Sequence, residues 1–201
     1  MPGTAKIEFD DAVLVERCRQ GDSAAMERLI VKYQDRIYNV ILKMCGNRDD
    51  AAELTQDTFV KVIENIGKFR QQSSLYTWVF RIAVNLTLNY CQRKARVAFG
   101  SLDAEEVGLA NGAGAALKEY LYDRREPVPA DVAENKELCE LVIKLLMKLD
   151  ETYRAVIVLR DIEGMDYAQI AEILEVELGT VKSRLSRARN GLREMLEALT
   201  R

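Results

Sequence analysis

Hydrophobic residues recur every three or four positions along most of the chain, the spacing of amphipathic helices, and no segment alternates as a half-buried strand would. Residues 24–45 show this spacing most clearly. Their apolar positions are Met26, Leu29, Ile30, Tyr33, Ile37, Val40, Ile41 and Met44. The pattern predicts further helices at 11–20, 51–66, 75–96, 134–149, 152–163, 167–175 and 179–199. We therefore expect an all-α fold.

Residues that favour turns and helix caps stand between these segments. Gly46 tolerates the left-handed conformation that ends many helices. We expect Asp49 or Asp50 to cap the helix that follows, because acidic side chains at a helix N-terminus also favour the macrodipole. Asp166, with Gln169 three residues later, predicts a capping box.

Two of these helices have apolar faces that we expect to be buried. The faces are Ala52, Thr55, Phe59, Val62, Ile63 and Ile66 in the first, and Leu75, Val79, Ile82, Leu86 and Tyr90 in the second. Trp78 lies beside the second face. Bulky aromatic side chains usually fill cores, so we expect Trp78 to be buried and not to stack on bases.

Residues 97–133 differ from the rest of the chain. They contain the run GLANGAGAA, two prolines, and seven acidic against three basic side chains. This composition predicts a flexible linker with a root-mean-square reach of about 33 Å. The sequence thus predicts two small helical domains, residues 1–96 and 134–201, that move independently.

Composition excludes several classes of protein. The chain has 201 residues and 48% hydrophobic residues, enough for one large or two small domains, and no apolar run long enough to cross a membrane. The N-terminus lacks the apolar core of a signal peptide, which favours a cytoplasmic protein. Histidine is absent, and Cys18, Cys45, Cys91 and Cys139 form no C-x-x-C pair. We expect free, mostly buried thiols and no metal or cofactor.

Charge is concentrated near the C-terminus, although the net charge is only −3. Residues 134–178 hold five basic and eleven acidic side chains, whereas residues 179–193 hold five basic and no acidic ones. This second segment follows a short break after a helix. Its apolar stripe is Val181, Leu185, Ala188 and Leu192, and its outward positions are Lys182, Ser183, Ser186, Arg187, Asn190 and Arg193. The arrangement is typical of a helix-turn-helix, whose second helix enters the major groove; a solvated basic face is the simpler alternative.

These residues carry a family resemblance. The run GMDYAQIAEILEVELGTVKSRLSRAR resembles the promoter-recognition helix-turn-helix of bacterial RNA polymerase sigma factors, in the form found in the extracytoplasmic-function group of the sigma-70 family. The runs VERCRQGDSAAMERLIVKYQDRIY, AAELTQDTFVKVIENIGKF and YTWVFRIAVNLTLNY resemble that group's first domain, in the same order. The likeness covers about residues 10–96 and 134–198 and is greatest to the subgroup that answers envelope stress.

The resemblance implies roles for the first domain. Residues matching positions that contact a coiled coil of core polymerase are Glu53, Gln56 and Asp57. Residues matching the segment that opens and reads the minus-ten element are Ser73, Ser74 and Tyr76 in a base-capturing loop, Asn85 for a base edge, and Arg93, Lys94 and Arg96 for phosphates.

The second domain is implied to bind the minus-thirty-five element. Its candidate residues are Thr180, Lys182, Ser183, Arg184, Ser186, Arg187 and Arg189. Helix geometry favours Lys182, Ser183, Ser186 and Arg187 as base readers, and we expect Arg184 and Arg189 mainly to hold phosphates. The implied partners are core RNA polymerase, promoter DNA and an anti-sigma factor that could hold the protein at the inner membrane face, without membrane insertion. No catalytic residue is expected.

Three other functions are weighed against this one. A two-component or quorum-type regulator shares the helix-turn-helix. It also needs a receiver or ligand-binding domain with strands, and the pattern of residues 1–96 predicts helices instead. A helical enzyme lacks visible machinery, since there is no histidine and no phosphate-binding glycine loop. A phage or plasmid sigma-like protein could bind polymerase without directing promoters, and only transcription data separate that alternative.

Overall fold

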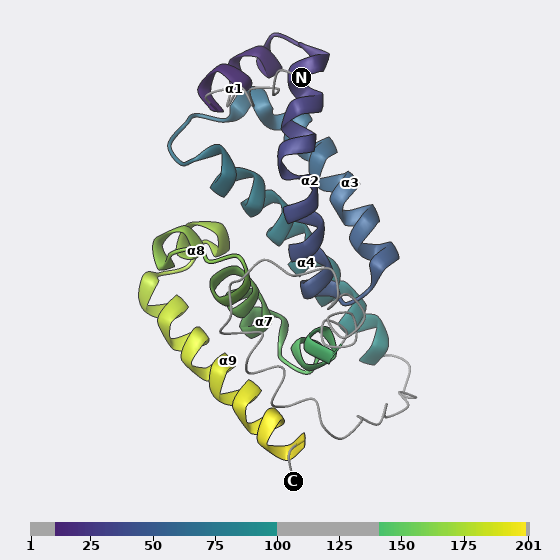
Figure 1. Cartoon of the computed structure of the whole chain (residues 1–201), viewed down its shortest axis with the longest axis vertical. Helices are drawn as coiled ribbons and strands as arrows, with labels where there is room; N and C mark the ends of the chain where they lie inside the picture. The colour runs from purple at the N-terminus through teal and green to yellow at the C-terminus, as the bar shows by residue number, and fades with distance from the viewer. Residues whose placement is uncertain (1–10, 100–140, 200–201) are drawn as a thin grey trace, which may run out of the picture.

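Helices account for the regular structure of the chain where it is described. A computed structural model describes residues 11–99 and 141–199. Its elements are α1 (Asp11–Arg19), α2 (Ser23–Cys45), α3 (Arg48–Asn65), the short 3-10 turn η1 (Ile66–Lys68), α4 (Leu75–Phe99), α7 (Glu151–Ile157), the π-helical turn η3 (Val158–Ile162), α8 (Tyr167–Leu174) and α9 (Leu178–Leu199) (Figure 1). Residues 141–147 are also helical. The all-α expectation is confirmed for these residues, which contain no strand.

Residues 100–133 of the predicted linker and residues 134–140 of the helix expected at 134–149 lie outside the described residues. Helix α4 extends to Phe99, three residues past the end expected for the first domain. Helix α9 begins at Leu178, one residue before the expected start. The segment expected as one helix at 152–163 is α7 followed by the wider π turn η3.

Local caps explain where α2 and α3 begin and end. Gly46 adopts φ of 75° and its N–H donates to the Leu42 carbonyl at 2.8 Å, which closes α2 as expected. The expected cap of α3 was wrong. Asn47, not Asp49 or Asp50, is the N-cap, and its side-chain oxygen accepts from the Asp49 and Asp50 N–H groups at 2.9 and 3.0 Å. The two aspartates instead occupy the first turn, where their charge favours the helix dipole.

The buried face of α3 is shifted from the expected one. Its buried residues are Ala51, Leu54, Thr58, Phe59 and Val62. Ala52 and Ile63 are exposed, so their predicted burial was wrong, and Thr55 is only half-buried. The Thr58 hydroxyl donates to the Leu54 carbonyl at 2.7 Å. This bond satisfies the hydroxyl inside the core, so Thr58 can be buried although its side chain is polar.

Helix α4 is buried on more than one side. Leu75 and Val79 are buried as expected, whereas Ile82, Leu86 and Tyr90 are only half-buried. Trp78 is 8% exposed and its ring lies 5.0 Å from that of Phe69, which confirms its place in the core. The pattern did not predict four other buried residues of α4, namely Phe80, Ala83, Val84 and Thr87.

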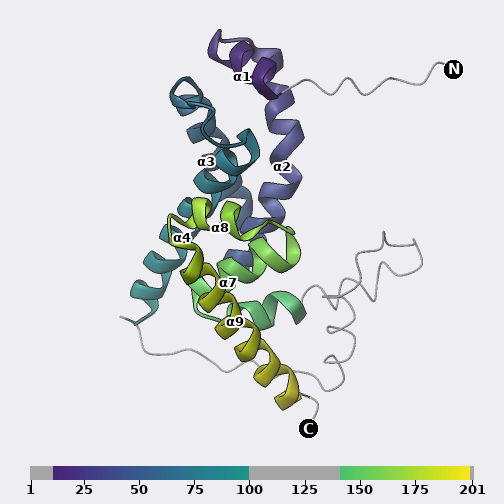
Figure 2. The ribbon, with the colours of Figure 1, turned by 90° about the vertical axis from the view of Figure 1, so that its left-hand side faces the viewer.

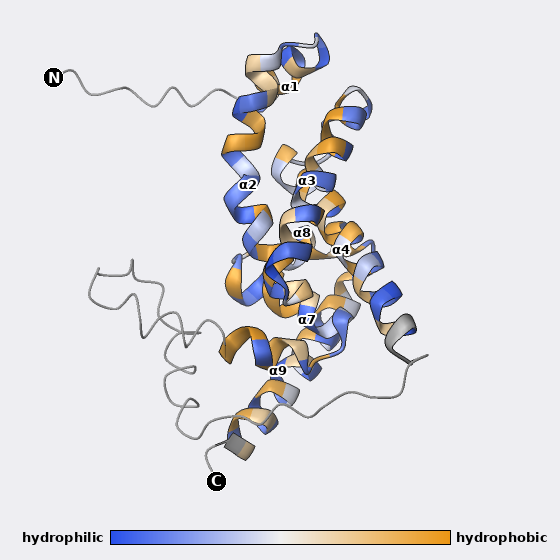
Figure 3. Ribbon diagram, turned by 90° about the vertical axis from the view of Figure 1, so that its right-hand side faces the viewer, coloured by the Kyte–Doolittle hydropathy of each residue, from blue (hydrophilic) through white to orange (hydrophobic). Residues whose placement is uncertain are grey.

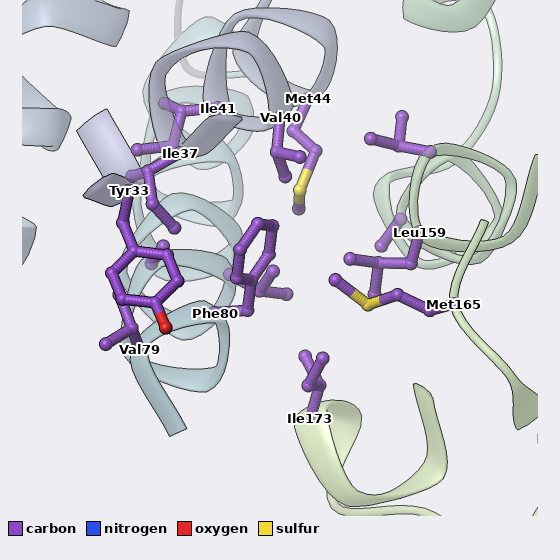
Figure 4. Packing of buried hydrophobic residues seen from close by; sticks show 14 of the residues in the cluster. Tyr33, Ile37, Val40, Ile41, Met44, Val79, Phe80, Leu159, Met165 and Ile173 are labelled. Atoms are coloured by element: carbon purple, nitrogen blue, oxygen red, sulfur yellow. The ribbon is translucent and has the colours of Figure 1, made fainter. Parts of the chain in front are cut away.

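The two helical units pack against each other. Helices α2, α3 and α4 form the first unit, and α4 lies beside α8 and α7 of the second (Figures 1 and 2). Met44 and Phe80 face Leu159, Met165 and Ile173 across the junction (Figure 4). Hydrophobic positions alternate with hydrophilic ones along the helices that border this core (Figure 3). One continuous cluster of buried apolar side chains therefore spans both units.

Polar contacts accompany this core at the junction. Arg36 of α2 pairs with Glu163 at 3.1 Å, and the Glu163 side chain is only 9% exposed. Arg154 of α7 is buried and donates to the Met44 carbonyl at the end of α2. A Cβ at Gly46 would meet the Met147 side chain of the second unit, which would have to shift, so the two units approach closely at this turn.

The described cysteines are unpaired thiols. Cys18 is buried, and Cys45 and Cys91 are half-buried. Burial raises the pKa of all three thiols, which disfavours the reactive thiolate. Cys139 lies outside the described residues. Within residues 11–99 and 141–199, no group of histidine, cysteine or carboxylate side chains could hold a metal ion. None of the helices described combines the length and apolarity that crossing a bilayer requires.

Candidate nucleic-acid interface

A tight turn joins α8 to α9. The capping box is confirmed: the Gln169 N–H donates to Asp166 Oδ1 at 2.8 Å, and the Asp166 N–H donates to Gln169 Oε1 at 3.0 Å. Glu175 ends α8 in the left-handed conformation, with φ of 52° and its N–H bonded to the Ala171 carbonyl. A non-glycine residue in this conformation costs about 1–2 kcal/mol, which the packing of both helices must offset.

Helix α9 presents a basic face directly opposite its buried stripe. Val181, Leu185, Ala188 and Leu192 are at most 8% exposed, which confirms the inward stripe. The expected outward residues are all exposed, namely Lys182, Ser183, Ser186, Arg187, Asn190 and Arg193. Thr180 and Arg184 are half-buried on the flanks. The hydroxyl of Ser183 donates to the Thr180 carbonyl at 3.0 Å, and its lone pairs remain able to accept a hydrogen bond.

Arg189 has different surroundings from the other basic residues of α9. Its Nη2 and Nε lie 2.5 and 3.1 Å from the two carboxylate oxygens of Asp161 in η3. The pair joins residues that are 28 positions apart. The expected phosphate-binding residue therefore has a carboxylate partner within the protein.

Some candidates for the minus-ten element also have partners within the protein. The Ser74 hydroxyl accepts from the Thr77 N–H at 3.0 Å, so it caps α4. The Tyr76 hydroxyl accepts from Arg36 Nη2 at 2.9 Å, and burial raises the pKa of Tyr76 to about 12.

Lys94 is held on the α3 side of α4. Its Nζ donates to Asp50 Oδ2 at 2.9 Å and to the Tyr90 hydroxyl at 3.2 Å. These hydrogen bonds, with Asp50 the stronger influence, raise the pKa of Lys94. Lys94 is therefore an ion-pair partner of the α3 N-terminus in this structure.

The remaining candidates on α4 share another side of the helix. At about 100° per residue, Asn85, Arg93 and Arg96 project away from the side that carries Tyr76 and Lys94. Arg93 and Arg96 are exposed and Asn85 is half-buried. Tyr76 and Arg96 are about 30 Å apart along the helix axis, so the candidates are spread along α4 on two of its sides and do not converge in one pocket.

Sequence reasoning missed Asn89 on this face. Its side chain is exposed one helical turn beyond Asn85. The four-residue spacing of two amides was visible in the sequence and could have indicated it. Ser73 precedes α4 and is half-buried, so it lies at one end of this face.

The three candidates for polymerase binding share the outer face of α3. Glu53, Gln56 and Asp57 are exposed. The same face continues with Val60, 54% exposed, and reaches Ile63, 36% exposed. Two apolar side chains beside acidic and amide groups are typical of a protein-binding surface, and the sequence pattern had assigned Ile63 to the core.

A cleft at the junction of the two units has a volume of about 240 Å³. Its lining is Arg36, Tyr76, Glu163, Gly164, Met165 and Gln169. The cation and the carboxylate are paired with each other. This site therefore belongs to the contact between the units, and the exposed helix faces are the stronger candidates for function.

Comparisons with known proteins show the family to which the chain belongs. Residues 29–97 match the family model of Sigma-70 region 2, and residues 139–192 match that of Sigma-70, region 4. The ECF RNA polymerase sigma-E factor of Salmonella typhimurium is 33% identical over 195 residues, covering 96% of this chain and 98% of that protein. The chain belongs to the extracytoplasmic-function (ECF) sigma factors of the sigma-70 family.

Two solved structures share the fold of this ECF sigma factor. CnrH in complex with the cytosolic domain of CnrY has a TM-score of 0.65, at 24% identity, and covers 94% of this chain and 97% of that chain. The sigma factor RpoE of Bartonella quintana in complex with the anti-sigma factor NepR has a TM-score of 0.60, also at 24% identity. The match covers 85% of this chain and 96% of that chain.

Membership settles the general function. A sigma factor gives core RNA polymerase its promoter recognition, so this chain directs promoter-specific transcription initiation. Regulators of other helix-turn-helix classes, and helical enzymes, are not favoured, because the family matches include region 2 as well as the helix-turn-helix. Sigma factors are not themselves enzymes.

Proposed function

We propose that this ECF sigma factor carries three contact surfaces: α3 for core polymerase, α4 for the minus-ten element and α9 for the minus-thirty-five element. The observation that carries the proposal is α9 itself. Its basic face lies opposite a buried stripe and follows a capped helix and a tight turn. This is the geometry in which a recognition helix enters the major groove.

On α9, the residues near the N-terminus reach base edges. The base readers are Lys182, Ser183, Ser186 and Arg187, and Thr180 and Arg184 contact the backbone from the flanks. Arg187 is exposed and long enough for a two-pronged hydrogen bond to guanine. The expected phosphate role of Arg189 competes with its bond to Asp161 and is taken up below.

On α4, the face formed by Asn85 and Asn89 reads bases of the opened strand, and Arg93 and Arg96 hold phosphates. Ser73 lies at the end of the loop that precedes this face. Ser74, Tyr76 and Lys94 support α4 in the free protein. Tyr76 and Lys94 reach DNA when they exchange Arg36 and Asp50 for it.

On α3, Glu53, Gln56 and Asp57 make polar contacts with a basic helical surface of the polymerase. Val60 adds an apolar contact in the same stripe. A mixed interface of this kind suits a reversible complex, which a factor that exchanges on core polymerase requires.

The packed arrangement sets a condition for promoter binding. The two promoter elements are about 25 base pairs apart, or about 85 Å of duplex. Helices α4 and α8 are in contact, so the units separate before both elements are bound. A partner that holds the units together would inhibit transcription.

The proposed partner of this kind is an anti-sigma factor, by analogy with the RpoE–NepR complex. The proposed location is the cytoplasm, at the membrane face when the anti-sigma factor is itself membrane-bound. The chain contributes no catalytic residue, because the polymerase forms the bonds of the transcript.

In vitro transcription tests the proposed function. Core polymerase would transcribe a genomic library with and without the full chain, followed by mapping of start sites. The expected result is a set of starts that depends on the chain and shares two spaced sequence elements. Polymerase binding without new start sites would contradict the proposal and favour a sigma-like protein that does not direct promoters.

A further inference from the structure

The turn η3 holds a carboxylate against the recognition helix. Helix α7 widens into the π turn Val158–Ile162, in which the Glu163 N–H reaches back to the Val158 carbonyl at 3.0 Å. Asp161 projects from this turn toward α9. Such turns disrupt regular helix geometry and persist where the altered direction of a side chain is useful.

Asp161 and Arg189 form a two-pronged ion pair. Both carboxylate oxygens and two guanidinium nitrogens take part, at 2.5 and 3.1 Å. The Asp161 side chain is 22% exposed and that of Arg189 48% exposed. Planar, two-pronged pairing fixes orientation as well as distance, which a lysine could not do.

The position of Arg189 on α9 differs from that of Arg187. Arg189 follows the buried Leu185 by four residues, a rotation of about 40°, whereas Arg187 follows it by two, a rotation of about 200°. Arg189 therefore lies beside the protein-facing stripe. A phosphate that approached it would compete with a carboxylate already in place and be repelled by its charge.

We propose that Asp161 is a positioning residue for the recognition helix, and that Arg189 serves this pairing instead of holding phosphate. The buried stripe holds α9 on the core, and the Asp161–Arg189 pair adds a directional contact beside that stripe. A rotation of about 15° would move side chains at the helix surface by about 1.5 Å. The pair prevents that rotation and so keeps Arg187 and Ser186 aligned with base edges.

This inference rests on the proposed function of α9, and the test separates the two. Holoenzyme formed with the full chain is measured for binding to promoters carrying single substitutions in the minus-thirty-five element, over a series of salt concentrations. The variants are Asp161→Asn, Arg189→Gln, Arg189→Lys, the double variant Asp161→Asn with Arg189→Gln, and Arg187→Ala. The matched control is Glu163→Gln, which removes the other paired carboxylate of the same segment without touching α9.

Pairing predicts similar effects from both sides. Asp161→Asn and Arg189→Gln each weaken binding to the best element by about two- to fivefold and reduce discrimination among elements, and the double variant is no weaker than either. Arg189→Lys weakens binding and discrimination as much as Arg189→Gln, because lysine keeps the positive charge but cannot form the two-pronged pair with Asp161. The salt dependence stays that of the wild type, and Glu163→Gln leaves discrimination unchanged.

A phosphate contact predicts the opposite pattern and would overturn the inference. Asp161→Asn would then strengthen binding, Arg189→Lys would behave like the wild type, and Arg189→Gln would reduce the salt slope by about 0.9. Loss of thermal stability without a change in discrimination would also overturn it, since a purely structural pair does that. If Arg187→Ala leaves the minus-thirty-five preference intact, the proposed function of α9 fails independently.

Discussion

At the scale of single residues, partners distinguish side chains that look alike in the sequence. Arg187 and Arg189 are two positions apart in a basic run, yet Arg187 is exposed and Arg189 is bonded to Asp161. Tyr76 and Asn85 are both polar residues of α4, yet Tyr76 is bonded to Arg36. Fewer charged and polar side chains are therefore available to promoter DNA than the sequence alone suggests.

The Arg187 side chain carries the sharpest residue-scale prediction. Arg187→Ala should relax specificity at one or two adjacent base pairs of the minus-thirty-five element, because a two-pronged contact to guanine is worth about 1–3 kcal/mol of discrimination. A substitution scan of the element with wild-type and variant holoenzyme measures this. Equal weakening on every element would place Arg187 among the phosphate contacts instead.

At the scale of helices, the sequence predicted where helices begin and end better than which of their faces are buried. Caps and the 3.6-residue spacing are local, so α8 begins where Asp166 indicated. Burial depends on what packs against a helix. Phe80 was missed because the second unit covers α4 from another side, and Thr58 because its hydroxyl is satisfied internally. The π turn has no sequence signal that hydrophobic spacing could detect.

The turn between α8 and α9 carries an element-scale prediction. Glu175→Ile should lower the thermal midpoint of the full chain by several degrees, since a β-branched residue is strained at φ of 52° and each kcal/mol shifts the midpoint by about 2–4 °C. Glu175→Gly should match or exceed the wild type. Circular dichroism measures both. The control is Glu172→Ile on the exposed face of α8, and a larger loss for it than for Glu175→Ile would contradict the strain argument.

The outer face of α3 is the subject of a second prediction at the scale of helices. Charge reversal of Glu53 and Asp57 to lysine should abolish co-purification with core polymerase and preserve the helical circular dichroism signal, because both side chains are exposed. Reversal of Glu27 and Asp35, exposed acids on α2, makes the same charge change elsewhere and should leave binding intact. Retention of polymerase by the α3 variant would remove this face from the interface.

At the scale of the whole molecule, the two units that we propose bind separate promoter elements are packed together. The shared core, the Arg36–Glu163 pair and the bond from Arg154 to Met44 join them. The sequence predicted two domains and a linker but not this contact, because contacts between distant segments leave no local periodicity. Burial lowers the pKa of Arg154, and its carbonyl partners compensate for part of that desolvation.

Separation of the units can be followed as a distance. Labels introduced as noncanonical amino acids at Val31 of α2 and Glu172 of α8, both exposed, should be close in the free chain and tens of ångströms farther apart in the promoter complex. The reason is that the two elements are about 85 Å apart on DNA. A Val31–Ile63 pair within the first unit should not change. An unchanged Val31–Glu172 distance in an initiating complex would show that the packed form binds promoters.

Photocrosslinking within the holoenzyme–promoter complex tests the assignment of the two DNA-binding helices most directly. A photoreactive amino acid would replace Ser186 of α9 or Asn89 of α4, with exposed Val31 of α2 as the control position. The account predicts that position 186 crosslinks to the minus-thirty-five element, position 89 to the opened minus-ten element, and position 31 to neither. Crosslinking of position 186 to the minus-ten element, or of neither helix to the promoter, would contradict it.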